Sequence, residues 1–308
     1  MKITIHFMMK NKLINSYING NTKVSIYEDG TKVREYPSKP IFDFPESLDV
    51  KISNFCNLDL ICGYCHEQSN KKGKHANLTN LINKLIELPV KGIELAIGGG
   101  NPLSHPNLEV FLMMLKEIGF ISNLTVNQLH LKQYHKLLIS LIEQNLIKGL
   151  GISYRKDEFN IKELSFNKYE NTVIHLIAGI DNYKVINNLI NLGFNKFLIL
   201  GYKQFGNGID YYSNNNNLIE KNIKEWCMYL PNYFGKCIIS FDNLAIEQLN
   251  IKRFFTDKGW DKFFLGNDGS HSMYIDAVKE EFSKTSRSSE RKSFNDCTLM
   301  EYFQHIKI

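Results

Sequence analysis

The feature that most constrains the fold of this chain is an alternation of strand-like and helix-like segments between about residues 48 and 200. Short apolar segments typical of buried strands are separated by stretches whose apolar residues recur every three or four positions, as on one face of a helix. The expected strands are 48–55, 92–97, 123–127, 149–154, 173–178 and 196–200. The expected helices are 78–86, 108–115, 132–146, 183–192 and 218–230, with a polar loop at 214–217. Such alternation indicates parallel β/α units. We therefore predict an α/β fold, a partial parallel (β/α)6 TIM-like barrel that is open on one side.

The segments on either side of this alternation have different patterns. Residues 1–47 predict a small β-rich N-terminal appendage with a hairpin at 24–36, because the Asp29-Gly30 pair in its middle favours a tight turn. Residues 48–236 form the expected barrel core, and residues 237–308 predict a C-terminal extension of β-hairpin and helix. In this extension we expect a strand at 237–240, a hairpin at 263–278 and an exposed serine-rich segment at 286–293.

Composition and charge point to an ordinary globular protein. The chain has 308 residues, of which 43% are hydrophobic and 22% are charged. Its net charge of +5 is spread along the sequence and gives no argument for a nucleic-acid partner. No run of eighteen apolar residues occurs, and the N-terminus lacks the apolar segment of a secretion signal. We therefore expect a cytoplasmic protein that crosses no membrane.

Three of the six cysteines lie within ten residues of one another. Cys56, Cys62 and Cys65 have the spacing C-x5-C-x2-C and follow directly on the first barrel strand. Thiolates are soft ligands that suit iron–sulfur clusters and zinc. Zinc sites usually take their ligands as two separated pairs, and the sequence has no second pair. An iron–sulfur cluster is therefore favoured over zinc bound with the help of His66, and over a chance grouping of buried thiols. Three cysteines on a [4Fe–4S] cluster leave one iron without a protein ligand.

Two segments together resemble a known family. The first is Cys62-Gly63-Tyr64-Cys65, and the second is the strand end Gly98-Gly99-Gly100-Asn101-Pro102. They are similar to the cysteine loop and the Gly-Gly-Glu-Pro motif of the radical S-adenosylmethionine (SAM) superfamily. The first cysteine gap is two residues longer than the usual C-x3-C-x2-C, and Asn101 stands where the family has Glu. The resemblance implies a [4Fe–4S] cluster and SAM as cofactors, with Tyr64 and residues 98–101 beside SAM. A plain glycine turn between strand and helix is the alternative for the second segment.

Polar residues also end the later strands, as they do in that family. Asn127 ends the third strand, and Ser153 and Arg155 end the fourth. The resemblance implies that these residues bind SAM, because amide and hydroxyl groups suit ribose and a guanidinium suits a carboxylate. Ordinary polarity of strand ends is the alternative for each. Ligands of β/α barrels bind at the carboxyl ends of the strands, where all of these residues fall. Lys203 follows the sixth strand, and we expect it to be a surface lysine.

The remaining cysteines, Cys227, Cys237 and Cys297, are far apart in the sequence. The tail is faintly similar to the SPASM-like extensions of some radical SAM proteins, but it lacks their usual cysteines. Because cysteine is commonly buried, we expect these three to be free buried thiols and not ligands of a second cluster. The sequence as a whole is similar to uncharacterised radical SAM proteins of bacteria and phages, a likeness that indicates no substrate.

We therefore predict a radical SAM enzyme that cleaves SAM reductively and modifies an unknown substrate. That substrate is a peptide or protein, or a nucleoside or nucleic acid, and the electron donor is a protein such as flavodoxin or ferredoxin. No RNA-binding module is recognisable, although nucleic acid stays open as a substrate. The alternative is a non-catalytic zinc or iron–sulfur binding module that serves interaction. The three glycines and the polar strand ends favour the enzyme, because a binding module needs no SAM site.

Overall fold

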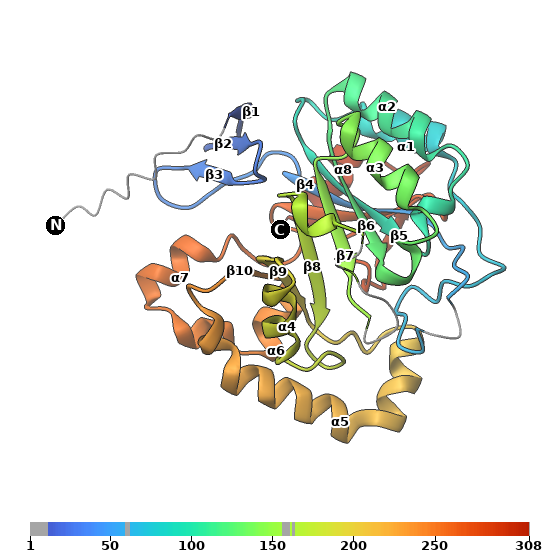
Figure 1. The fold of residues 1–308 in the computed structure, drawn as a ribbon. Coiled ribbons are helices and arrows are strands. Elements are labelled where there is room, and N and C mark those ends of the chain that lie inside the picture. Colours follow the sequence, from blue (N-terminus) through green and yellow to red (C-terminus); the bar gives the residue numbers. More distant parts are fainter. Residues whose placement is uncertain (1–11, 59–61, 156–160, 162–163, 308) are drawn as a thin grey trace.

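The computed structural model describes residues 12–58, 62–155, 161 and 164–307 (Figure 1). Its main element is a ten-stranded sheet with the order β10-β9-β8-β7-β6-β5-β4-β11-β12-β13. These strands are β4 (Ser47–Ser53), β5 (Glu94–Gly99), β6 (Ile121–Asn127), β7 (Gly149–Ser153), β8 (Thr172–Ile177), β9 (Lys196–Leu200), β10 (Ile238–Phe241), β11 (Ser272–Asp276), β12 (Glu281–Ser283) and β13 (Arg291–Ser293). The helices are α1 (Leu78–Leu85), α2 (Leu108–Ile118), α3 (His135–Glu143), α4 (Val185–Asn191), α5 (Asn207–Tyr229), α6 (Asn243–Gln248), α7 (Asp257–Phe263) and α8 (Leu299–Ile306). Short 3-10 helices are η1 (Pro102–Ser104), η2 (Gln128–His130), η3 (Phe166–Lys168), η4 (Leu230–Tyr233) and η5 (Ile251–Phe254).

The direction of the strands confirms the α/β class. Neighbouring strands pair in parallel from β10 through β4 to β11, whereas β12 pairs antiparallel with both β11 and β13. The six predicted strands are β4 to β9, and each of β5 to β9 lies beside the strand that precedes it in the sequence. Within the described residues β10 and β13 are not paired with each other, so the large sheet is open. A partial barrel stays our prediction for its curvature.

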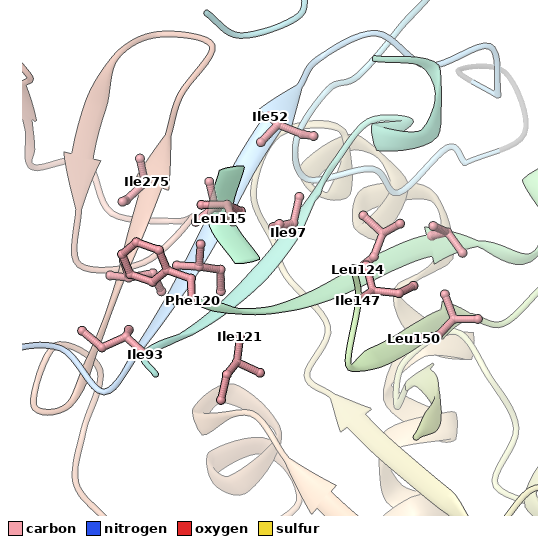
Figure 2. Packing of buried hydrophobic residues seen from close by; sticks show 14 of the residues in the cluster. Ile52, Ile93, Ile97, Leu115, Phe120, Ile121, Leu124, Ile147, Leu150 and Ile275 are labelled. Atoms are coloured by element: carbon pink, nitrogen blue, oxygen red, sulfur yellow. The ribbon is translucent and has the colours of Figure 1, made fainter. Parts of the chain in front are cut away.

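Alternating side chains give the sheet an apolar face and a polar face, because successive residues of a strand point to opposite sides. On β4, Val50 and Ile52 are buried in the hydrophobic core, and Lys51 between them points to the other face. Figure 2 shows Ile52 and Ile97 packed near Leu115 of α2. Burial of one such aliphatic side chain contributes about 1.5–3 kcal/mol. The apolar face therefore holds the helices, and the polar face is left for a site.

The amphipathic pattern also predicts the first helices well. In α1 the leucines 81 and 85 are fully buried, and the side chain of Asn77 caps the helix by accepting the backbone N–H groups of Thr79 and Asn80. Such a cap stabilises a helix by about 0.5–2 kcal/mol. Gly119 ends α2 in the left-handed conformation at a φ of 102°, which suits a residue without Cβ. The predicted helices at 78–86, 108–115, 132–146 and 183–192 are confirmed as α1 to α4.

A small antiparallel sheet precedes the main one. It consists of β1 (Leu13–Asn19), β2 (Thr22–Tyr27) and β3 (Lys32–Glu35), so the predicted hairpin is confirmed and β1 is an addition to it. Lys32 and Arg34 form ion pairs with Glu46, which is 1% exposed just before β4. Burial alone would raise the pKa of Glu46, but the two cations lower it to about 2. Lys32 also pairs with Glu94 of β5. The appendage is therefore fixed at the amino ends of β4 and β5.

The loop predicted at 214–217 is wrong, because these residues lie inside α5. Only Asn215 departs from helical backbone angles, at a φ of −136°. The side chains of Ser213, Asn214 and Asn215 each donate to the backbone carbonyl four residues earlier. Asparagine and serine favour loops because they compete for backbone groups, but here that bonding stays within the helix. The helix therefore begins at Asn207, eleven residues before the predicted start at 218.

The hairpin predicted at 263–278 is also wrong. Phe263 ends α7, and Gly266 and Gly269, with φ of 132° and 84°, lead the chain into β11. β11 then pairs in parallel with β4 and antiparallel with β12, so its partners are not the residues before the glycines. Residues 286–293 are mostly half-buried, not exposed, because β13 extends the sheet and Arg291 lies against Asp276. The strand predicted at 237–240 is confirmed as β10.

Two general predictions bear on the chain as a whole. No helix in the described part of the chain combines the length and apolar character that crossing a membrane requires. The elements β10 to β13 belong to the same sheet as β4 to β9. The division into residues 1–47, 48–236 and 237–308 therefore stays a proposal based on the sequence pattern.

Candidate functional site

The cysteine loop begins where β4 ends and is held there by backbone hydrogen bonds. The N–H of Gly100 donates to the carbonyl of Ser53, and the N–H of Asn101 donates to that of Phe55, both at 2.7 Å. The N–H of Cys56 in turn donates to the carbonyl of Asn70 at 2.9 Å. The start of the loop is thus fixed between the end of β5 and residue 70, and Cys56 is buried there.

The three glycines at the end of β5 have different surroundings. A Cβ on Gly99 would lie 2.4 Å from the carbonyl oxygen of Ser53, and one on Gly100 would lie 2.3 Å from that of Phe55. Close packing against the start of the cysteine loop therefore requires both glycines. A Cβ on Gly98 would meet nothing nearer than Thr125, at 3.8 Å. Close packing therefore explains why Gly99 and Gly100 are glycines. At Gly98 no such contact exists, and the surface there is open to a ligand.

Six of the predicted site residues line one cavity of about 180 Å³ at the carboxyl ends of the parallel strands. Two are the thiols of Cys62 and Cys65, and the others come from the same loop and from the ends of β6 and β7. The six residues are Cys62, Tyr64, Cys65, Asn127, Ser153 and Arg155. The polar face of the sheet therefore gathers residues that are more than ninety positions apart in the sequence.

The other predicted residues do not line this cavity. Cys56 follows the end of β4, and residues 98–101 lie at the end of β5 and just after it. None of them is among the residues that line the cavity. Within the described residues, no group of three or more His, Cys, Asp or Glu side chains is arranged to hold a metal ion. The three thiols are therefore not gathered around one point in this structure. Residues 59–61, which include the two extra residues of the first cysteine gap, lie outside the described part.

Polar contacts connect the cysteine loop to the ends of β6 and β7. The side-chain amide of Asn127 donates to the sulfur of Cys62 at 3.7 Å. The side chain of Gln128 accepts the backbone N–H of Arg155 at 2.8 Å, and the Arg155 guanidinium lies 4.8 Å from the centre of the Tyr64 ring. Arginine stacks well on an aromatic face in this range. These contacts hold Asn127 against Cys62 and Arg155 against Tyr64 without any ligand.

The electrostatics of the thiols depend on burial and on Arg155. Burial raises the pKa of Cys62, and the nearby Arg155 charge and the Asn127 amide oppose that rise. The sulfur of Cys56 accepts the backbone N–H of Leu58 at 3.4 Å. N–H donors at sulfur stabilise the negatively charged form, which is the form that binds iron or zinc. The donor chemistry at both cysteines therefore fits soft-metal ligation.

The side chain of Asn101 has a buried oxygen without a hydrogen-bond partner among the described residues, and such an atom suits a ligand. Its side chain is fully buried, and its Nδ2 donates to the hydroxyl of Tyr134 at 3.4 Å. Among the described residues its Oδ1 has no hydrogen-bond partner. A buried polar atom without a partner costs about 1–3 kcal/mol, and such atoms are rare in folded proteins. The amide oxygen is therefore available to a donor such as an amino group.

Sequence reasoning missed two residues that line the cavity. His175, on β8 beside Ser153, is half-buried, and burial lowers its pKa to about 4. Lys203 was expected on the surface, but it lines the cavity and its Nζ lies 3.2 Å from Nε2 of His66. His175 lies near the carboxyl end of the parallel strand β8, and Lys203 follows the carboxyl end of β9. A position near the carboxyl end of a parallel strand is therefore the sequence signal that indicates both residues.

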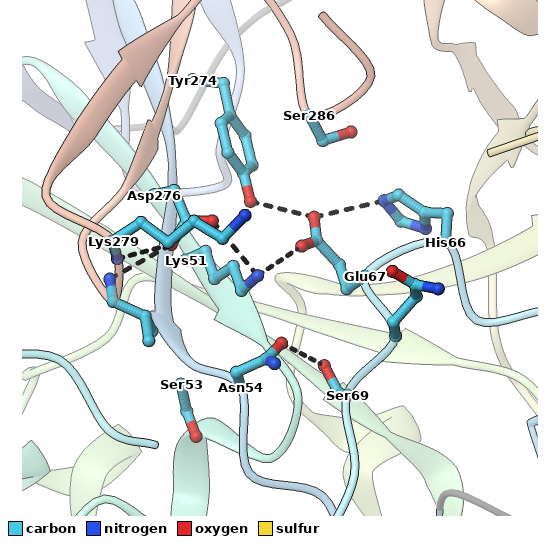
Figure 3. A network of polar contacts seen from close by, with 12 residues as sticks. Lys51, Ser53, Asn54, His66, Glu67, Ser69, Tyr274, Asp276, Lys279 and Ser286 are labelled. Atoms are coloured by element: carbon cyan, nitrogen blue, oxygen red, sulfur yellow. Dashed lines mark hydrogen bonds and ion pairs between the residues drawn. The ribbon is translucent and has the colours of Figure 1, made fainter. Parts of the chain in front are cut away.

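A polar network fixes the far end of the cysteine loop (Figure 3). The carboxylate of Glu67 pairs with Lys51 of β4 at 2.8 Å and accepts the hydroxyl of Tyr274 of β11 at 2.9 Å. Lys51 also pairs with Asp276 at 3.2 Å. The two carboxylates raise the pKa of Lys51, although its burial acts in the opposite direction. Because Glu67 follows Cys65 by two residues, the network connects the loop to β4 and to the C-terminal extension.

A larger groove adjoins the cavity. It has a volume of about 1430 Å³, and Tyr64, Tyr154 and Arg155 line both spaces. The tyrosines of the groove alternate with asparagines and with Lys184 and Lys236. Such a lining offers ring surfaces and amide groups to a polar ligand larger than one cofactor. The two spaces therefore give access from outside to the cysteines.

Comparisons with known proteins show a similarity of fold. No protein-family model and no curated protein sequence matches the chain. The structure of Streptococcus suis SuiB bound to the precursor peptide SuiA is similar, with a TM-score of 0.58 and 15% identity over 85% of this chain and 65% of SuiB. SuiB bound to S-adenosylmethionine gives a TM-score of 0.59 at 15% identity, over 87% of this chain and 68% of SuiB. This chain therefore spans about two thirds of SuiB and shares its fold.

Proposed function

We propose that this chain is a radical SAM enzyme whose substrate is a peptide or protein. The observation that carries the proposal is the single cavity in which Cys62, Cys65, Asn127, Ser153 and Arg155 meet at the ends of parallel strands. A binding module that only held a metal would not need the polar ends of two strands beside its thiols. The shared fold with SuiB, which was crystallised with SAM and with a precursor peptide, supports both the cofactor and the peptide over a nucleic acid.

Each predicted residue has a role in the proposal. Cys56, Cys62 and Cys65 would hold a [4Fe–4S] cluster, and the open surface at Gly98 and the unpaired amide oxygen of Asn101 would receive the amino group of SAM. Ser153 would bind a ribose hydroxyl and Arg155 the SAM carboxylate, since a guanidinium binds a carboxylate through two parallel hydrogen bonds. The Tyr64 ring, already stacked with Arg155, would close one side of the site.

The cofactors would supply the reactive chemistry when bound, namely one-electron cleavage of SAM to methionine and a 5′-deoxyadenosyl radical. The chain itself would bind and orient SAM and hold the substrate at the mouth of the cavity. His175 stays neutral at physiological pH because burial lowers its pKa to about 4, so it adds no charge there. A flavodoxin or ferredoxin would deliver the electron, and a cytoplasmic location would keep the cluster reduced.

The competing function is a zinc-binding or iron–sulfur binding module without catalysis. One observation favours zinc, since His66 lines the cavity beside Cys62 and Cys65. However, Nε2 of His66 lies 3.2 Å from the Lys203 ammonium and 3.4 Å from the Glu67 carboxylate. His66 is thus engaged away from the thiols in this structure.

Metal analysis separates these functions. The protein would be purified and reconstituted without oxygen, with Cys62→Ala as the test variant and Cys227→Ala as the matched control. Cys227 is half-buried and bonded to the carbonyl of Gln248, away from the cavity. We expect about four irons per chain in the wild type and in the control, and a loss of iron in Cys62→Ala. Stoichiometric zinc with no uptake of iron would refute the proposal.

A further inference from the structure

A second cavity adjoins the end of the cysteine loop. Its volume is about 600 Å³, and it shares His66 with the first cavity. Three segments line it with charged side chains: Lys51 from β4, Glu67 from the loop, and Asp276, Lys279 and Arg291 from the C-terminal extension. Figure 3 shows Ser286 facing His66 and Glu67 across this space. Nothing in the proposed SAM site uses these residues.

Each oxygen of the two carboxylates of this cavity already has a partner within the protein. Glu67 uses one oxygen for Lys51 and the other for the hydroxyl of Tyr274. Asp276 accepts the backbone N–H groups of Val278 and Lys279 at one oxygen and pairs with Lys51 at the other. Both side chains are therefore satisfied within the protein. A metal ion or an amine would have to break an existing ion pair to bind here.

The cations, in contrast, keep unused donors. The Nη1 of Arg291 is buried and has no hydrogen-bond partner among the described residues. This atom forms ion pairs with Glu281 Oε2, which also lacks a hydrogen-bond partner, at 3.6 Å and with Asp276 at 3.9 Å, both beyond normal hydrogen-bond distance. The Nη2 of Arg291 donates to the backbone carbonyl of Ser286 at 3.0 Å. The Lys203 ammonium has two neutral partners, His66 and Ser286, each at 3.2 Å. Within the described part of the chain, Lys203 has no carboxylate within 4 Å. Arg291 and Lys203 thus each keep at least one N–H donor without a partner at hydrogen-bond distance among the described residues.

The charges agree with the hydrogen bonds. Three cations, Lys51, Lys279 and Arg291, line the cavity against two carboxylates, and Lys203 adds a fourth cation at the boundary with the first cavity. A half-buried group loses part of its hydration, so an unpaired cation there attracts an anion more strongly than one on the open surface. The arrangement also connects the spaces, because the same ammonium lines the cavity of the thiols and bonds to Ser286 in the other.

We propose that the second cavity is an anion subsite that takes a carboxylate of the substrate, with Arg291, Lys203 and Ser286 as its donors. This inference rests on the proposed function, because it assumes a peptide substrate. The fork of Arg291 suits a planar carboxylate, and an aspartate or glutamate side chain is the commonest such group in a peptide. A carboxylate held here would place its neighbouring residues beside the thiol cavity through the shared His66 wall. Lys203 and Arg291 would thus choose which residue is presented for reaction.

The test measures binding of two small probes to the reconstituted protein in the presence of saturating SAM. The probes are N-acetyl-glutamate N-methylamide and its neutral isostere, N-acetyl-glutamine N-methylamide, followed by ligand-observed NMR. We expect the acid to bind at least tenfold more tightly than the amide. Arg291→Lys and Lys203→Met should each weaken binding of the acid about tenfold and leave the amide unchanged, and Ser286→Ala should weaken it about threefold. Lys252→Gln, on the exposed side of η5, is the control that should change neither value.

Four results would overturn the inference. These are failure of the acid to bind, equal binding of acid and amide, displacement of the acid by SAM, and tighter binding of inorganic phosphate than of the acid. Displacement by SAM would assign the cations to the cofactor carboxylate, and the phosphate result would assign them to a phosphate ligand. Thermal unfolding of each variant shows whether it is folded. Arg291→Lys keeps the positive charge and removes only the guanidinium fork. SAM cleavage, measured on the same sample without probe, tests the proposed function separately.

Discussion

Replacement of Tyr274 by Phe tests whether the network around Glu67 holds the cysteine loop. The change removes one oxygen and keeps the ring. Tyr274 is 6% exposed, and its hydroxyl donates to the Glu67 carboxylate at 2.9 Å. A hydrogen bond to a charged group contributes about 1.5–3 kcal/mol, and the carboxylate left behind is itself mostly buried. We therefore expect the free energy of unfolding to fall by about 1.5–3 kcal/mol, measured by urea denaturation of the metal-free protein.

Tyr17 offers a matched control. It is also buried, but its hydroxyl has no hydrogen-bond partner among the described residues. Removal of an unsatisfied buried hydroxyl is close to neutral, so Tyr17→Phe should change the free energy of unfolding by less than about 0.5 kcal/mol. A double-mutant cycle with Glu67→Gln should give a coupling of about 1 kcal/mol or more for the pair with Tyr274. Equal losses in the two Tyr variants, or no coupling to Glu67, would refute the reasoning.

Three further predictions concern other parts of the chain. Because ion pairs lower the folded-state pKa of Glu46 from 4.5 to about 2, its contribution is complete well above pH 4.5 and is lost as the pH falls toward 2. Free energies of unfolding from urea denaturation at pH 5.5 and pH 3 should therefore differ by about 2 kcal/mol. Gly100→Ala should cost about 1–3 kcal/mol, because its Cβ would lie 2.3 Å from a carbonyl oxygen, whereas Gly98→Ala should fold normally and weaken SAM binding; denaturation and SAM titration check both. Ser153→Ala should weaken SAM binding by about 0.5–1.5 kcal/mol and Arg155→Ala by more, in a calorimetric titration in which equal effects would contradict the assigned roles.

The parallel strands β4 to β9 were predictable because their pattern is local and regular. The strand at 196–200 was predicted to the residue, since it is a short apolar run between polar boundaries. The site was partly predictable for the same reason, because parallel strands bring their carboxyl ends to one edge whatever the loops do. Asn127 and Ser153, from neighbouring strands, therefore met in one cavity as expected.

The rest depended on contacts between distant residues. β11 was misjudged because its partner is β4, more than 200 residues earlier, and a local glycine turn says nothing about such a pairing. The roles of Lys51 and Glu67 were missed for the same reason, since each is an unremarkable charged residue until Asp276 and Tyr274 lie beside it. The helix at 207–229 was misjudged because its asparagines bond within the helix, against their usual preference for turns.

The measurement that tests the central claim most directly is formation of 5′-deoxyadenosine. The reconstituted protein would be mixed with SAM and with dithionite or a flavodoxin reducing system under anaerobic conditions, and the products separated by chromatography. We predict 5′-deoxyadenosine and methionine in equal amounts from the wild type, and neither from Cys62→Ala. A protein that binds about four irons and forms no 5′-deoxyadenosine, or a Cys62→Ala variant with unchanged turnover, would contradict the account.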